Sequence, residues 1–183
     1  MNKFSGILSV AVALMAPAAL AAELHAEAKQ QFMGFAKELK GALQQGVKEG
    51  GFENAISVCN VKAPEIAQAH SAGDWQIRRT SLKLRNPENK PDDWELSVLQ
   101  SFEERLAAGE PATTLVASKQ ENGEFRFMKA IPTGKLCLSC HGANMTQNLE
   151  QKLDGLYPQD QARGYSVGDI RGAFSLRKPL NQL

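Results

Sequence analysis

The hydrophobic pattern near the start of the chain predicts one long amphipathic helix. Apolar residues recur at steps of four and three, at Leu24, Ala28, Phe32, Phe35, Leu39, Leu43 and Val47. This spacing places them on one face of a helix of about six turns. Gly50-Gly51 follows and is typical of a helix end.

Shorter helices are expected on either side of Pro64. The segment from Phe52 to Cys59 carries apolar residues at helical spacing, and this helix should stop near Lys62-Ala63, because the residue before a proline avoids the helical region. Pro64 then begins a separate helix that runs from Glu65 to His70.

The rest of the chain alternates between strands and helices. Helices are predicted from Asp92 or Asp93 to Gly109 and from Met145 to Leu156. Strands are predicted at Trp75–Leu84, Thr113–Ala117, Glu124–Ile131 and Ile170–Leu176. The middle two form a hairpin around Glu121-Asn122-Gly123. This order indicates an α+β fold with an antiparallel sheet of four or five strands and flanking helices.

The first 22 residues have the features of a cleaved secretory signal. Lys3 gives a positive start, and an apolar run of about ten residues from Ile7 to Ala16 follows it. Ala19-Leu20-Ala21 matches the A-x-A pattern, so cleavage is expected just beyond it. An uncleaved anchor is the alternative, but a membrane span needs roughly twenty apolar residues. We therefore divide the chain into a signal peptide, residues 1–22, and one periplasmic domain, residues 23–183.

The mature domain is expected to carry no net charge. Lys3 is the only charged residue of the signal segment, so 20 of the 21 basic side chains remain against 20 acidic ones. That balance argues against nucleic acid or an anionic membrane surface as the main partner. No second apolar run is long enough to span a membrane.

The most specific chemical signal is Cys137-Leu138-Ser139-Cys140-His141. C-x-x-C-H is the attachment signature of c-type haem: the thiols bind the porphyrin vinyl groups, and the histidine becomes the proximal iron ligand. A half zinc knuckle and a dithiol redox pair are the alternatives. Zinc would need a second pair of ligands, and a redox pair would not need His141. We therefore predict one covalent haem c held by Cys137, Cys140 and His141.

The sixth iron ligand is not fixed by spacing alone. The candidates are Cys59, His25, His70, Met33, Met128 and Met145. Both histidines lie near helix ends, where exposed roles are expected, and core packing is expected for Met33 and Met128. Met145 is only four residues beyond His141. Cys59 is left over in an oxidising compartment, as an iron ligand or as a small buried hydrophobe.

A family resemblance adds to this interpretation. Residues 55–60, 63–64, 79–87, 89, 91, 94–95, 137–142, 164–165 and 168–173 match motifs of the exported c-type haem proteins with a PAS-like fold. The chain therefore resembles that family, formerly a domain of unknown function, over almost its whole mature length. The resemblance implies a PAS-like sheet packed by helices, one covalent haem, and a Cys/His pair of axial ligands. The matching cysteine is Cys59.

The propionate carboxylates of a haem need hydrogen-bond donors from the protein. Arg79 and Arg85 flank the apolar positions of a predicted strand, which makes them candidates for bidentate contacts to those carboxylates. The alternative is that both are solvated charges at a sheet edge. Spacing alone does not place Tyr165 relative to them.

We expect a monohaem cytochrome-like protein, not an enzyme, that transfers single electrons or senses redox state with an unknown redox or signalling partner. A Cys59 thiolate would favour ferric iron and a low potential; its departure on reduction would open the iron to carbon monoxide or nitric oxide. The second hypothesis is therefore a gas or redox sensor that acts through a partner protein, with dimerisation through the 24–47 helix left open. A haem peroxidase ranks third, because it requires an open iron and distal acid–base groups.

Overall fold

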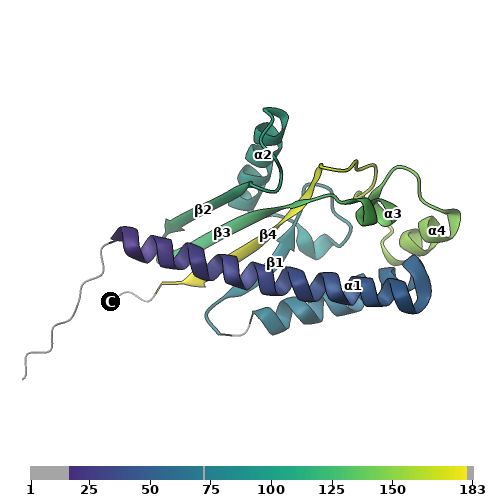
Figure 1. Cartoon of the computed structure of the whole chain (residues 1–183), viewed down its shortest axis with the longest axis horizontal. Helices are drawn as coiled ribbons and strands as arrows, with labels where there is room; N and C mark the ends of the chain where they lie inside the picture. The colour runs from purple at the N-terminus through teal and green to yellow at the C-terminus, as the bar shows by residue number, and fades with distance from the viewer. Residues whose placement is uncertain (1–16, 72, 181–183) are drawn as a thin grey trace, which may run out of the picture.

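The computed structural model describes residues 17–71 and 73–180. The signal-peptide prediction falls largely on residues 1–16, which lie outside this range. The described fold begins with helix α1, Pro17–His70. Gly50 and Gly51 leave the helical backbone, so α1 folds back on itself as two helices lying side by side (Figure 1). The predicted helix over residues 24–47 and its end at Gly50-Gly51 are confirmed.

The second half of α1 differs from the prediction, because it is one helix rather than two. Pro64 lies inside it, although proline cannot donate a backbone hydrogen bond to the carbonyl of Asn60. Ala63 and Ile66 are buried on either side of Pro64, and Ile66 packs in one cluster with Phe35 of the first half. Packing between the two halves thus stabilises the helix through the proline, an effect that local preference does not include.

Four antiparallel strands form one sheet in the order β1-β4-β3-β2. They are β1 Gln76–Thr80, β2 Val116–Glu121, β3 Glu124–Pro132 and β4 Ile170–Pro179. The α+β class and the strand number are confirmed. The first strand ends at Thr80, earlier than the predicted end at Leu84. Ser81 Oγ lies 2.9 Å from the Lys83 carbonyl and 3.0 Å from that of Arg171, so it holds a turn where the strand was expected to continue.

Strands β2 and β3 form the predicted hairpin. Asn122 and Gly123 both have positive φ, 52° and 73°, as the type I′ turn requires. Glu121 pairs with Glu124 directly beside this turn. Pairing therefore begins at the turn, and β2 lies later in the chain than the predicted strand Thr113–Ala117.

A helix covers each face of the sheet. Helix α1 packs on one face, in the cluster Leu24, Ala28, Phe35, Ile66, Trp75, Ile77, Phe125, Phe127 and Leu176. Helix α2, Asp93–Ala107, packs on the other, in the cluster Val98, Leu99, Phe102, Ala112, Leu115, Met128, Ala130, Ile170 and Ala173. Asp92 and Glu95 form a capping box at the start of α2, which confirms the predicted aspartate cap.

The cysteine motif lies at the end of the sheet near the turn of α1 (Figure 1). It spans the short helices η2, Lys135–Cys137, and α3, Leu138–His141, and is followed by α4, Gln147–Leu156. A further short helix, η1, covers Pro87–Asn89 in the predicted loop. Within residues 17–71 and 73–180, no helix is long and apolar enough to cross a membrane.

Candidate functional site

The Cys137–His141 motif forms a tight helical turn. Helix η2 passes directly into α3, and the N–H of Gly142 donates to the Leu138 carbonyl at 2.9 Å. A Cβ atom at Gly142 would lie 2.6 Å from that oxygen, so only glycine allows this close approach. Cys137, Cys140 and His141 are each half-buried in the turn.

The imidazole of His141 has a fixed orientation. Its Nδ1 lies 2.8 Å from the carbonyl oxygen of Ala162, and because a carbonyl can only accept, Nδ1 carries the proton. Burial, together with the charges of Arg171 and Arg85, lowers the pKa of His141 to about 3. The ring is therefore neutral at ordinary pH, and Nε2 carries the lone pair that a metal ligand requires. Arg85 Nη1 lies 3.5 Å from this nitrogen.

Asp160 holds the loop that orients His141. Its buried carboxylate accepts hydrogen bonds from Arg85 Nε at 3.1 Å, Arg163 Nε at 2.8 Å and the Ala162 N–H at 2.9 Å. Arg85 also donates to the Cys140 carbonyl at 2.6 Å. Arg85 and Asp160 therefore connect the cysteine motif to the Ala162 carbonyl.

Cys59, in the second half of α1, lies near the motif. Burial raises the pKa of the Cys140 thiol, and the nearby charges of Cys59 and Cys137 raise it further. Burial and Cys59 likewise raise the pKa of Tyr157, whose hydroxyl donates to Asn60 at 3.1 Å. The fold thus brings the third cysteine to the other two across about eighty residues of chain.

An apolar cluster lies beside these sulfur atoms. It contains Ile56 of α1 together with Leu149, Leu153 and Tyr157, and Cys140 and Met145 pack against it. Helix α4 supplies two of its four buried members. The polar motif is therefore bordered by an apolar surface formed by α1 and α4.

Two arginines complete the site. Burial lowers the pKa of the Arg79 guanidinium, and the charge of Arg171 lowers it further, whereas Cys59 and Tyr157 oppose this. Arg171 Nε is buried and has no hydrogen-bond partner among the described residues. Arg171, Asp160 and Ala162 were not among the predicted site residues. Two signals pointed to Arg171: it lies in the family motif 168–173, and it is a basic residue at the start of the apolar strand 170–176. Of the predicted arginines, Arg85 is bonded within the protein and Arg79 lies beside Arg171.

The other candidate ligands occupy different places. His25 Nε2 lies 2.9 Å from Ser118 Oγ, and His70 Nε2 lies 2.8 Å from a Glu38 carboxylate oxygen. Met33 is 53% exposed on α1, and Met128 is fully buried in the cluster beneath α2. Of the six candidates, Cys59 and Met145 are the ones placed beside the motif.

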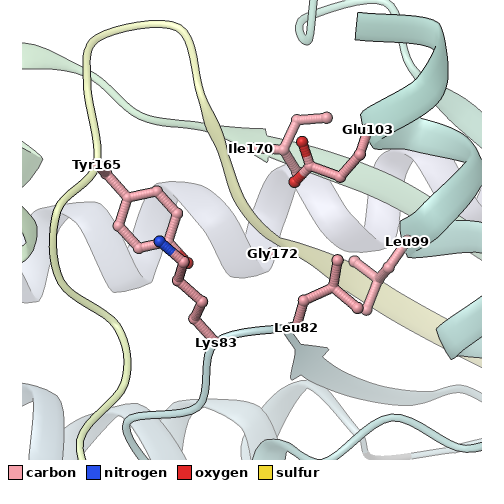
Figure 2. Close-up of a pocket in the computed structure, with 7 residues that line it drawn as sticks. All are labelled: Leu82, Lys83, Leu99, Glu103, Tyr165, Ile170 and Gly172. Carbon is pink, nitrogen blue, oxygen red and sulfur yellow. The ribbon is translucent and has the colours of Figure 1, made fainter. Parts of the chain in front are cut away.

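Tyr165 contacts His141 and also lines a small cavity of about 90 Å³. The two rings meet edge to face at 6.2 Å between centroids, and the Tyr165 N–H donates to the His141 carbonyl at 3.0 Å. Figure 2 shows Lys83 beside the Tyr165 ring at one side of the cavity and Glu103 at the other. Burial, then the charge of Asp169, raises the pKa of Glu103. The structure thus places Tyr165 at the site, which spacing could not do.

Comparisons with known proteins bear on this site. The family model described as Tll0287-like matches residues 15–179. Among solved structures, the crystal structure of the cyanobacterial haem protein Tll0287 is similar, with a TM-score of 0.63 and 22% sequence identity. That match covers 86% of this chain and 98% of the other. No curated protein matches the sequence. The structural likeness shows a shared fold, and the resemblance to a c-type haem domain family is confirmed: this chain belongs to the Tll0287-like family.

Proposed function

We propose that this protein is an exported c-type haem protein that carries or senses single electrons. The observation that carries the proposal is the orientation of His141 within C-x-x-C-H. Its Nδ1–H is held by the Ala162 carbonyl at 2.8 Å, which leaves Nε2 as the coordinating nitrogen. The family match and the likeness to Tll0287, itself a haem protein, support the same cofactor.

The residues present fit one haem. Cys137 and Cys140 would bind its vinyl groups, and His141 Nε2 and Cys59 Sγ would ligate the iron. The apolar cluster of α1 and α4 would contact the porphyrin, and uncompensated arginines lie nearby. When bound, haem supplies an iron that alternates between the ferric and ferrous states.

The protein's own groups prepare these ligands. Because the pKa of His141 is lowered to about 3, no proton has to leave Nε2 before it can coordinate at neutral pH. The hydrogen bonds that Asp160 accepts from Arg85 and from the Ala162 N–H hold the imidazole in place. A thiolate at Cys59 would offset the extra charge of ferric iron, which favours the oxidised state and a low potential.

This ligand set favours electron transfer or redox sensing over catalysis. Iron held by two protein ligands leaves no position for a substrate, and a peroxidase also needs distal acid–base groups. His25 and His70, the spare histidines, are bonded to Ser118 and Glu38. The partner we propose is a redox or signalling protein of the periplasm.

Covalent haem is the first test. The full chain is expressed with its signal segment in a bacterium that matures c-type cytochromes. We expect haem that remains on the chain after denaturation and a mass increase of one haem on the peptide that contains Cys137 and Cys140. The Cys137→Ala, Cys140→Ala chain should lose both signals. Absence of covalent haem from the unaltered chain contradicts the proposal.

Spectra of Cys59→Ala test the sixth ligand. We expect the ferric absorption and electron paramagnetic resonance spectra to lose their thiolate features, because a charged sulfur ligand is removed. Met145→Leu is the matched control, since Met145 packs against the same cluster and should leave the spectra unchanged. If the ferric spectrum changes in Met145→Leu but not in Cys59→Ala, ligation by Cys59 is contradicted and the sulfur of Met145 is the ligand.

A further inference from the structure

Two arginines at the candidate site have no anionic partner in the part of the chain that the structure describes. Arg79 lies on β1 and Arg171 on β4, neighbouring strands of the sheet. Among residues 17–71 and 73–180, neither guanidinium lies within 4.0 Å of a carboxylate oxygen. Each instead lies in the field of the other's positive charge.

Burial makes this arrangement costly. Desolvation is the largest cause of the lowered pKa of Arg79, and Arg171 Nε has neither solvent nor a hydrogen-bond partner. A buried charge is normally paired, because transfer from water without a partner is strongly unfavourable. Two half-buried guanidinium groups near each other therefore point to an anion that residues 17–71 and 73–180 do not supply.

The surroundings restrict what that anion is. The nearby carboxylate, Asp160, already accepts from Arg85 and Arg163 and is not free to serve a second pair. Arg79 lies near Cys59 and Tyr157, and Tyr157 belongs to the apolar cluster that borders Cys140. The ligand that fits has two negative groups and an apolar body, and it lies against the C-x-x-C-H motif.

We propose that Arg79 and Arg171 bind the two propionate carboxylates of the haem attached at Cys137 and Cys140. The inference rests on the proposed haem function and adds the residues that hold the acidic edge of the cofactor. It also distinguishes them from Arg85, whose charge is already paired with Asp160 and whose Nη1 lies 3.5 Å from His141 Nε2. Guanidinium groups suit this task, because they bind carboxylates through two parallel hydrogen bonds.

Haem with blocked carboxylates tests the proposal directly. The parent protein is the full chain with Cys137→Ala and Cys140→Ala, which lacks the thiols that would attach haem and should bind it without a covalent link. Ferric protoporphyrin IX and its dimethyl ester are titrated into it, and binding is followed by the Soret absorbance. We expect the diacid to bind roughly 10- to 100-fold more tightly than the ester, the size expected for charge-assisted hydrogen bonds.

Arginine variants of the parent then show which residues cause the preference for the diacid over the ester. Adding Arg79→Gln and Arg171→Gln to the parent should reduce the ratio of the two affinities to about one. Arg177→Gln is the matched control, because Arg177 lies on the same strand β4, opposite Gln76 and Arg126, and it should keep the full ratio. A preference for the diacid that survives without Arg79 and Arg171 overturns the inference.

The same titration distinguishes this inference from the proposed function. Equal binding of the diacid and the ester by the parent leaves haem binding in place and removes the propionate site. Failure of both porphyrins to bind a folded parent overturns both.

Resonance Raman spectra of the covalent protein give a second answer, independent of the cysteine variants. The propionate bending bands should shift in Arg79→Gln, Arg171→Gln and stay in place in Arg177→Gln. Bands that do not move in the double variant overturn the assignment.

Discussion

Arg78 and Arg79 are neighbours in β1, but they have opposite electrostatic surroundings. Arg78 donates to the fully buried carboxylate of Glu95 at 3.3 Å and to the carbonyls of Glu88 and Lys90 at 2.9 and 2.7 Å. Arg79 lies on the other face of the strand, where its charged neighbour is Arg171. Successive side chains of a strand point to opposite faces, so Arg78 and Arg79 lie on opposite sides of the sheet.

The two sides of the sheet differ in whether their arginine charges are paired with carboxylates. On the α2 side, Glu95 balances Arg78, and Arg126 donates to Asp92 at 2.6 Å. On the opposite side, Arg79 and Arg171 have no carboxylate among the described residues. We infer that the α2 side is built for stability of the chain alone, whereas the other side is built to receive a charged group.

The largest expected effect comes from breaking the balanced side. Glu95→Gln leaves Arg78 with an uncompensated charge next to a buried amide, and we expect a loss of about 3–5 kcal/mol in the free energy of unfolding. Urea unfolding of the holoprotein at pH 7 measures it.

Glu124→Gln is the control for Glu95→Gln. Glu124 contacts Arg126 at 3.9 Å and its side chain is 32% exposed, so its replacement should cost less than about 1 kcal/mol. If the two substitutions lower the free energy of unfolding equally, the buried ion pairs of Glu95 stabilise the fold no more than the exposed contact of Glu124.

Elements set by local chemistry were predictable from the sequence. The 24–47 stripe, the cap at Asp92 and the Asn122-Gly123 turn depend on residues within a few positions of one another, and each is present in the structure. The early stop expected at Pro64 was wrong, because burial of Ile66 against the other half of α1 outweighs a local preference.

The site was predictable only where it forms a local motif. Cys137, Cys140 and His141 are adjacent in sequence, but the carbonyl that orients His141 belongs to Ala162, 21 residues away. Every residue has a backbone carbonyl, so the sequence does not show which one accepts the hydrogen bond from His141. Arg171 was missed because the second guanidinium becomes informative only when the sheet places it near Arg79.

Asp160→Asn should have the next largest effect. Although burial alone would raise it, hydrogen bonds from Arg85 and Arg163 hold the pKa of Asp160 below its ordinary value. We expect the substitution to cost about 2 kcal/mol at pH 7, typical for hydrogen bonds to a charged group.

The destabilisation by Asp160→Asn should depend on pH. Because the folded pKa is depressed, the stabilisation is fully present above about pH 4 and is lost as the pH falls through the folded pKa. The difference between Asp160→Asn and the unaltered chain should therefore shrink in urea unfolding as the pH falls below about 4. Asp154→Asn is the control, since Asp154 bonds the same Arg163 but its side chain is 64% exposed. A difference that stays constant with pH contradicts the role of the charge.

The smallest expected effect is that of Arg79→Gln, measured beside Arg78→Gln in the full chain produced without haem. Arg78→Gln should lower its free energy of unfolding by about 1–3 kcal/mol, because it removes bonds to Glu95 and two carbonyls. Arg79→Gln should leave it unchanged or raise it by about 1 kcal/mol, because it relieves repulsion from Arg171 in a buried place. With haem attached, the sign at Arg79 should reverse, since the anion that compensates the guanidinium is then present. If both substitutions destabilise the haem-free chain equally, the two faces of β1 do not differ, and Arg79 is a structural residue like its neighbour.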